Sequence, residues 1–173
     1  MASKQVRYEA LVKALHGDLY RYAYWLVHDK HIAEDLVQET FLRAWKALDS
    51  LKDEKAAKSW LITILRRENA RRFERKQFDM SEYDEGATTD YLSTSTEQKQ
   101  EDHWLREKIF SLPIEYREPL TLQIIGGFSG EEIGKLLDLN KNTVMTRLFR
   151  ARNQLKDLIE QDNTNTIKGR YNG

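Results

Sequence analysis

Two stretches of the chain concentrate cationic side chains that could hold phosphate groups. Residues 66–76 contain six Lys or Arg against two Glu, and residues 141–156 contain five Lys or Arg with no acidic residue. Cations at this density bind nucleic-acid phosphates through contacts that weaken steeply with salt. A solvated helix face is the alternative for either stretch taken alone. Together, the two stretches favour a nucleic-acid partner.

The total charge of the chain conceals these stretches. Its 28 Lys and Arg balance 28 Asp and Glu, which gives a formal net charge of zero. By segment the charge is +4 over residues 51–80, −6 over 81–104 and +4 over 141–173. Because charge blocks matter more than the total for the choice of partner, the zero does not exclude nucleic acid.

The second cationic stretch follows a predicted helix-turn-helix. Ser129 and Glu132 have the spacing of a capping box, which predicts the start of a helix, and residues 138–140 predict a turn. Asn140 is a good cap for a second helix from 141 to about 159. Its predicted buried stripe is Val144, Leu148, Ala151 and Leu155. Met145, Thr146, Phe149 and Arg150 then project away from that stripe or along its margin, where a recognition helix meets base edges.

The first cationic stretch belongs to a predicted helical domain. The 68 residues between Gly17 and Gly86 contain neither Gly nor Pro, and apolar residues recur there at steps of three and four. We expect helices near 7–28, 31–49 and 55–77. In the second of these, Asp35, Gln38, Glu39 and Arg43 form a polar strip beside the apolar face.

The composition between these helical segments predicts a linker. Residues 81–103 are acidic and poor in apolar side chains, which favours a flexible tether. The expected fold is therefore all-α, with two small helical domains at 1–80 and 104–160, the second a helix-turn-helix. Residues 161–173 are expected to form a disordered tail.

Several classes of protein are disfavoured by composition. The chain has no Cys, so disulfides, a thiol nucleophile and Cys-ligated metal sites are excluded. No apolar run is long enough to span a membrane and no secretory signal is visible, so we expect no membrane insertion and a cytoplasmic location. His28 and His31 flank a predicted turn and do not favour a metal site. We expect no cofactor and no enzymatic activity, because Glu131 and Glu132 are explained by helix capping.

Longer motifs carry a resemblance to a known family. LPIEYREPL at 112–120, FSGEEI at 128–133 and NTVMTRLFRAR at 142–152 resemble region four of the sigma-70 family, in the class of extracytoplasmic-function (ECF) sigma factors. AEDLVQETFLRAW at 33–45 resembles the region-two helix that docks on polymerase in that family. KSWLITILRRENARRFERK at 58–76 resembles the helix that recognises and melts the minus-ten promoter element.

The resemblance implies a function and its residues. The chain is expected to be an alternative sigma factor. The alternatives are a helix-turn-helix regulator that acts without polymerase and a purely protein-binding helical scaffold or anti-sigma-binding mimic. Implied partners are promoter DNA, an anti-sigma factor and core RNA polymerase, through the clamp helices of its largest subunit and the flap of the second largest.

Implied polymerase-binding residues are Asp35, Leu36, Gln38, Glu39, Phe41 and Arg43. Implied minus-ten residues are Lys58, Trp60, Arg66, Arg67, Asn69, Arg71, Arg72 and Phe73, of which Trp60 and Phe73 are alternatively core aromatics. Implied minus-thirty-five residues are Lys141, Asn142, Thr143, Thr146, Arg147, Phe149 and Arg150, whereas Met145 stands where the family often has Lys or Arg.

Overall fold

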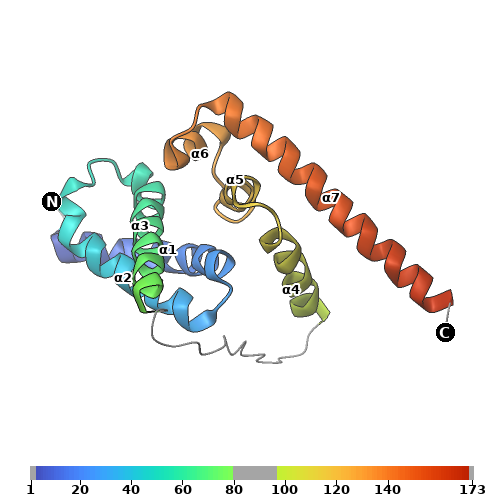
Figure 1. The fold of residues 1–173 in the computed structure, drawn as a ribbon. Coiled ribbons are helices and arrows are strands. Elements are labelled where there is room, and N and C mark those ends of the chain that lie inside the picture. Colours follow the sequence, from blue (N-terminus) through green and yellow to red (C-terminus); the bar gives the residue numbers. More distant parts are fainter. Residues whose placement is uncertain (1–2, 80–96, 172–173) are drawn as a thin grey trace. The chain divides into compact units, whose positions relative to one another are not determined.

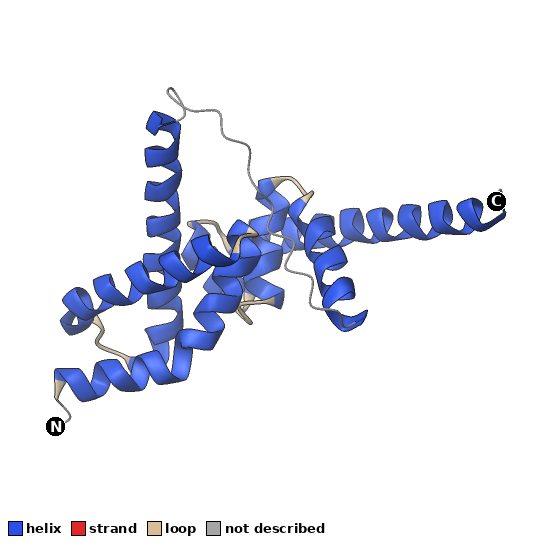
Figure 2. Ribbon diagram, turned by 90° about the horizontal axis from the view of Figure 1, so that it is seen from below, coloured by secondary structure: helices blue, strands red, loops and turns tan. Residues whose placement is uncertain are grey.

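The computed structural model describes residues 3–79 and 97–171, and all the regular structure in these ranges is helical (Figures 1 and 2). The chain divides into two compact units, with the division near residue 91. The predicted linker lies outside the described residues from 81 to 96. The expected all-α fold with a C-terminal helix-turn-helix is confirmed.

The N-terminal unit is built from three long helices that pack against one another. They are α1 (Lys4–Val27), α2 (Lys30–Ala47) and α3 (Ala57–Asp79), with short 3₁₀ turns at Leu48–Ser50 and Glu54–Ala56. Between α1 and α2, His28 adopts a left-handed conformation (φ 60°), and the Asp29 carboxylate accepts a hydrogen bond from the backbone N–H of Ile32 at 3.0 Å. This cap fixes the predicted turn between the two helices.

The core of this unit follows the predicted apolar stripes. Its fully buried side chains include Leu19 and Tyr22 of α1, Val37 of α2 and Leu61 and Leu65 of α3. Tyr8 also joins α1 to α2, because its hydroxyl donates to the Phe41 carbonyl at 3.0 Å. Core packing of this kind fixes the orientation of α2 and α3, and with it the side chains that each helix exposes.

Within residues 97–171, the C-terminal unit contains four helices, and the last of them contacts the other three. They are α4 (Glu97–Phe110), α5 (Ile114–Ile124), α6 (Gly130–Leu137) and α7 (Lys141–Tyr171). Val144, Leu148 and Ala151 of α7 are fully buried as predicted, and Leu155 is partly buried. The stripe therefore anchors the first half of α7 and turns its other faces outward.

Two predicted boundaries in this unit are wrong. Residues 97–103, which we expected in the linker, form the start of α4, and residues 161–171, which we expected in a disordered tail, continue α7 beyond 159. The physical reason for the longer α7 is a contact with α4. Trp104 and Lys108 of α4 both bind the carboxylate of Asp162 on α7, which gives each helix a partner.

Candidate nucleic-acid interface

The turn between α6 and α7 is tightly specified by its residues. The predicted capping box is present: the Ser129 hydroxyl accepts from the Glu132 N–H at 3.2 Å, and the Glu132 carboxylate accepts from the Ser129 N–H at 3.0 Å. Asp138 ends α6 in a left-handed conformation (φ 55°). Asn140 caps α7 by accepting from the Thr143 N–H at 2.8 Å. Both helix starts are therefore satisfied locally, as predicted.

Close backbone approach also shapes this turn. A Cβ built on Gly134 would lie 2.6 Å from the carbonyl oxygen of Leu139. Because real Cβ atoms do not come this close, a residue with a side chain at 134 would push the turn outward. Gly134 thus sets how near the start of α7 lies to α6.

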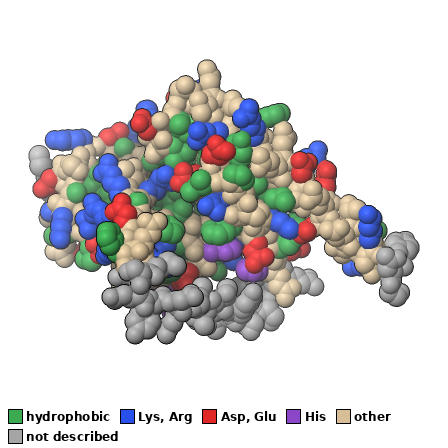
Figure 3. Space-filling model, viewed as in Figure 1, with side chains coloured by type: hydrophobic (Ala, Val, Ile, Leu, Met, Phe, Trp, Pro, Cys, Tyr) green, Lys and Arg blue, Asp and Glu red, His purple; other side chains and the backbone are tan. Residues whose placement is uncertain are grey.

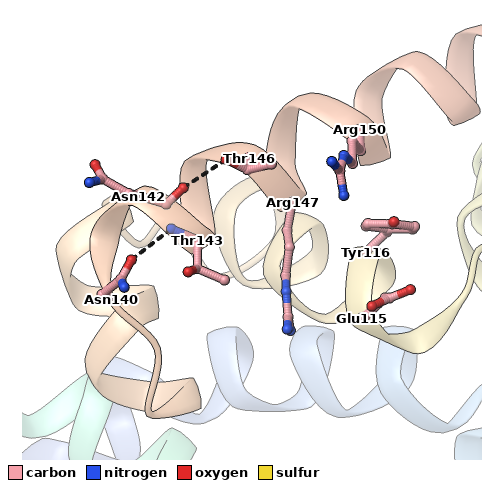
Figure 4. A pocket seen from close by; sticks show the side chains of 8 residues that line it. All are labelled: Glu115, Tyr116, Asn140, Asn142, Thr143, Thr146, Arg147 and Arg150. Carbon is pink, nitrogen blue, oxygen red and sulfur yellow. Dashed lines mark hydrogen bonds between the residues drawn. The ribbon is translucent and has the colours of Figure 1, made fainter.

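The recognition face of α7 presents most of the predicted minus-thirty-five residues. Lys141, Asn142, Thr146, Phe149 and Arg150 are exposed, with Phe149 66% exposed, and Thr143 and Arg147 are half-buried. Five of the seven, Asn142, Thr143, Thr146, Arg147 and Arg150, line one open pocket (Figure 4). The first three turns of α7 therefore bring hydroxyl, amide and guanidinium groups together, which are the groups that bind base edges and phosphates.

Helix α5 adds two residues to this pocket that are not among the predicted site residues. Glu115 and Tyr116 come from the first turn of α5 and lie on the side toward which Arg147 and Arg150 extend (Figure 4). No spacing in the sequence pairs α5 with α7, so only the fold reveals their place.

A second cationic surface follows α3. Arg67, Arg71, Arg75 and Lys76 are exposed, while Arg66 is half-buried and donates to the Tyr22 hydroxyl at 3.3 Å. The Arg72 guanidinium lies 4.8 Å from the ring centroid of Phe73, and burial lowers the pKa of Arg72. Phe73 is 52% exposed, which suits it for stacking on a base better than for a core role.

The remaining predicted minus-ten residues lie elsewhere. Lys58 is near the start of α3 and pairs with Asp18 of α1 at 3.7 Å. Trp60 is partly buried against Leu48, Leu51 and Ala57, which favours the core alternative. Asn69 is only 9% exposed and accepts hydrogen bonds from Arg72 at 3.4 Å. The structure therefore does not bring Trp60 and Asn69 into the exposed cationic surface.

The exposed strip on α2 contains part of the predicted polymerase-binding set. Asp35 and Gln38 are exposed and Glu39 and Arg43 are half-buried, with Arg43 donating to Glu39 at 3.2 Å. Leu36 and Phe41 lie on the opposite, buried side of α2 and anchor the helix in the core. Leu42 falls on the outward side of the helix and is 59% exposed. Leu42 is not among the predicted polymerase-binding residues, although an apolar residue between polar neighbours on that face was the available signal.

The wider surface carries charges of both signs. On the face shown in Figure 3, Lys and Arg are interspersed with Asp and Glu. No group of His, Asp and Glu in the described ranges is arranged to hold a metal ion. None of the helices over residues 3–79 and 97–171 is long and apolar enough to cross a bilayer.

The fold and its two cationic surfaces place the protein in the class of helix-turn-helix DNA-binding proteins. Family models agree on both halves: sigma-70 region 2 matches residues 11–78, and sigma-70 region 4 matches residues 102–155. The chain is 33% identical to the RNA polymerase sigma factor SigV of Bacillus subtilis, over 87% of this chain and 92% of SigV. It is 31% identical to the ECF sigma factor SigM of the same organism, over 84% of this chain and 90% of SigM.

Solved structures agree with these relatives. The sigma factor RpoE of Bartonella quintana, solved in complex with the anti-sigma factor NepR, superposes with a TM-score of 0.71 at 27% identity. That match covers 91% of this chain and 98% of RpoE. The chain therefore belongs to the ECF class of the sigma-70 family.

Proposed function

We propose that this chain is an alternative sigma factor that directs core RNA polymerase to specific promoters. One observation carries the proposal: region 2 and region 4 occur in one chain, in that order, and each presents an exposed polar or basic helix face. The catalytic step of transcription belongs to the polymerase, and this chain supplies recognition.

The strip on α2 is the proposed polymerase contact. Asp35, Gln38 and Glu39 offer acceptors and an amide on one helix face, which suits a basic and polar helical partner such as the clamp helices of the largest subunit. Leu42 adds an exposed apolar side chain to the same face. Leu36 and Phe41 act indirectly, by holding the helix against the core.

The exposed part of α3 is the proposed minus-ten contact. Its Arg and Lys side chains hold phosphates, and Phe73 offers a platform on which an unstacked base can rest. Stacking of that kind is worth about 1–3 kcal/mol per base. Strand opening is favoured when the separated bases gain such contacts.

The start of α7 is the proposed minus-thirty-five contact. We assign base contacts to Thr146, Phe149 and Arg150 and phosphate contacts to Lys141, Asn142, Thr143 and Arg147. The buried stripe on the opposite side and the cap at Asn140 fix the helix, so its outward groups are preorganised for a major groove. We propose that region 4 also meets the flap of the second largest polymerase subunit.

Neither unit needs to bind its promoter element strongly alone. When polymerase holds both units, the binding of one raises the effective concentration of the other at its DNA site. An anti-sigma partner is the proposed regulator, by analogy with the NepR complex of the Bartonella relative.

Transcription with purified core polymerase tests the proposal. The chain, core polymerase and fragments of the host genome should yield transcripts that start at defined sites and require the chain. An absence of such transcripts from every fragment would refute the sigma assignment. A helix-turn-helix regulator acting alone would bind its operator as tightly without polymerase as with it, so a binding titration with and without core enzyme separates the two functions.

A further inference from the structure

A buried carboxylate joins the two functional faces of the N-terminal unit. The side chain of Glu68 on α3 is only 2% exposed. Its Oε1 forms an ion pair with the Nε of Arg43 on α2 and a second with Nη1 of Arg71 on α3 at 2.9 Å. Glu68 belongs to neither predicted contact set.

The row of charges extends from one surface to the other. Glu39 on the α2 strip pairs with Arg43 at 3.2 Å, Arg43 pairs with Glu68, and Glu68 pairs with Arg71. The two ends are accessible, since the side chains of Glu39 and Arg71 are 44% and 47% exposed. Only the central carboxylate is removed from solvent.

Burial makes this carboxylate a strong anchor. A buried charge is costly unless it is paired, so Glu68 holds its two guanidinium partners more tightly than an exposed carboxylate would. Because Arg43 is held at Nε, the orientation of its guanidinium plane is restricted. The position of Arg71 is restricted in the same way from one turn further along α3.

The two arginines are assigned to different ligands. Arg43 belongs to the proposed polymerase-binding strip and Arg71 to the proposed minus-ten surface. We propose that Glu68 is a positioning residue for both, so that one buried carboxylate prepares Arg43 for polymerase and Arg71 for promoter DNA. This inference rests on the proposed function, because it uses the ligands assigned there.

Glu68→Gln in the full chain tests the inference, because the amide keeps the shape and removes the charge. We expect two affinities to fall, each roughly three- to tenfold: that of the variant for core polymerase, and that of its holoenzyme for single-stranded minus-ten DNA. A loss of this size is smaller than the loss of a complete hydrogen bond to a charged group. Glu9→Gln is the matched control. Glu9 is an exposed carboxylate on α1, outside both proposed contact surfaces, and its loss should leave both affinities within about twofold.

Double-mutant cycles separate positioning from a general structural role. In an Arg43→Ala background, Glu68→Gln should have no further effect on polymerase affinity, and in an Arg71→Ala background it should have no further effect on DNA affinity. Wild-type affinities for Glu68→Gln, or losses that persist undiminished in these backgrounds, would overturn the inference. If Glu68→Gln does not fold, as judged by thermal unfolding, Glu68→Met takes its place with the same expectations.

A measurement on the free chain distinguishes this inference from the proposed function. Hydrogen exchange at the Arg43 Nε–H, followed by ¹⁵N NMR, should be slow in the wild-type chain and several-fold faster in the Glu68 variant. Equal and rapid exchange in both would refute positioning even if transcription is normal. Failure of the wild-type chain to bind polymerase would instead refute the proposed function, and the exchange measurement would still decide the role of Glu68.

Discussion

Trp104 and Asp162 form a hydrogen bond across 58 residues of sequence, with the indole Nε1 donating to the carboxylate at 2.9 Å. Lys108, one turn after Trp104, pairs with the same carboxylate. These contacts join α4 to the part of α7 that lies beyond the region 4 match. Asp162 therefore ties the C-terminal half of α7 to α4 of its own domain.

The order of this helix end should depend on pH. The hydrogen bond from Lys108, and next that from Trp104, lowers the pKa of Asp162 below its ordinary value of 3.8. A lowered pKa in the folded state means that the contribution to stability is complete above that ordinary value and is lost as pH falls through the lowered one. Cα chemical shifts of residues 160–170 should stay helical down to about pH 4 and move toward coil below it.

Asp162→Asn should show the same loss of helicity at neutral pH, while Trp104→Phe should show a smaller loss. If the shifts of residues 160–170 were identical in wild type and Asp162→Asn at pH 7, the tie would have no role in ordering the helix.

Substitutions in the α2 strip should lower polymerase affinity without lowering the stability of the fold. Asp35→Ala combined with Gln38→Ala removes two exposed side chains, so polymerase affinity should fall while thermal unfolding stays unchanged. Leu36→Ala empties a buried site on the same helix and should instead destabilise the unit by about 2–5 kcal/mol. Pull-down with core enzyme and calorimetry measure the two effects.

Asp49→Ala is the control for the strip, because it removes an exposed acidic side chain from the 3₁₀ turn that follows α2. A double variant that bound polymerase no more weakly than Asp49→Ala would contradict the docking assignment.

Arg150→Ala should weaken binding at the minus-thirty-five element. If Arg150 reads a base, the loss should be about 1–3 kcal/mol for the preferred sequence and much less for others. If it contacts only phosphate, the loss should be uniform across sequences and the salt dependence should fall. Holoenzyme titrations on a library of promoter variants decide between the two.

Arg152→Ala is the matched control for Arg150. The Arg152 guanidinium donates to the side-chain oxygen of Gln123 on α5, so it faces the domain instead of the pocket. Equal losses for the two variants on every sequence would argue against a distinct recognition role for Arg150.

Gly134→Ala should disturb the turn without removing any DNA contact. The added methyl group would meet the Leu139 carbonyl at 2.6 Å, so the turn must shift, at a cost of about 1–3 kcal/mol. Minus-thirty-five affinity should fall with it, while polymerase affinity of the α2 strip should not change. Gly169→Ala is the control, because a Cβ there meets nothing within 4 Å. That substitution should be neutral or stabilise α7 slightly.

Local signals predicted several helix starts well, because side chains next to those starts cap them. The capping box at Ser129, the cap at Asn140 and the turn after His28 all depend on residues within four positions of one another. The expected helix near 55–77 differs from α3 by only two residues at each end. Capping interactions between residues so close in the chain can be predicted from the sequence alone.

Features that depend on distant partners were harder to predict. The extension of α7 contacts Trp104 and Lys108, more than 50 positions away, and composition alone suggested a frayed tail. The burial of Glu68 and Asn69 depends on how α2 and α3 pack, so the motif that contains them did not separate exposed from buried members. Leu42 shows the reverse case, an apolar residue that packing leaves outside.

The length of α7 has a mechanical consequence. Its 31 residues, at about 1.5 Å each, make a rod of roughly 46 Å, of which the recognition residues occupy only about the first 15 Å. Any change in the angle at which its tip sits in a groove is magnified at the opposite end, where a tilt of about 10° corresponds to about 5 Å of travel. The position of a fluorophore attached near the C-terminus would therefore report the angle at which α7 docks on DNA. The label itself would lie away from the DNA contact.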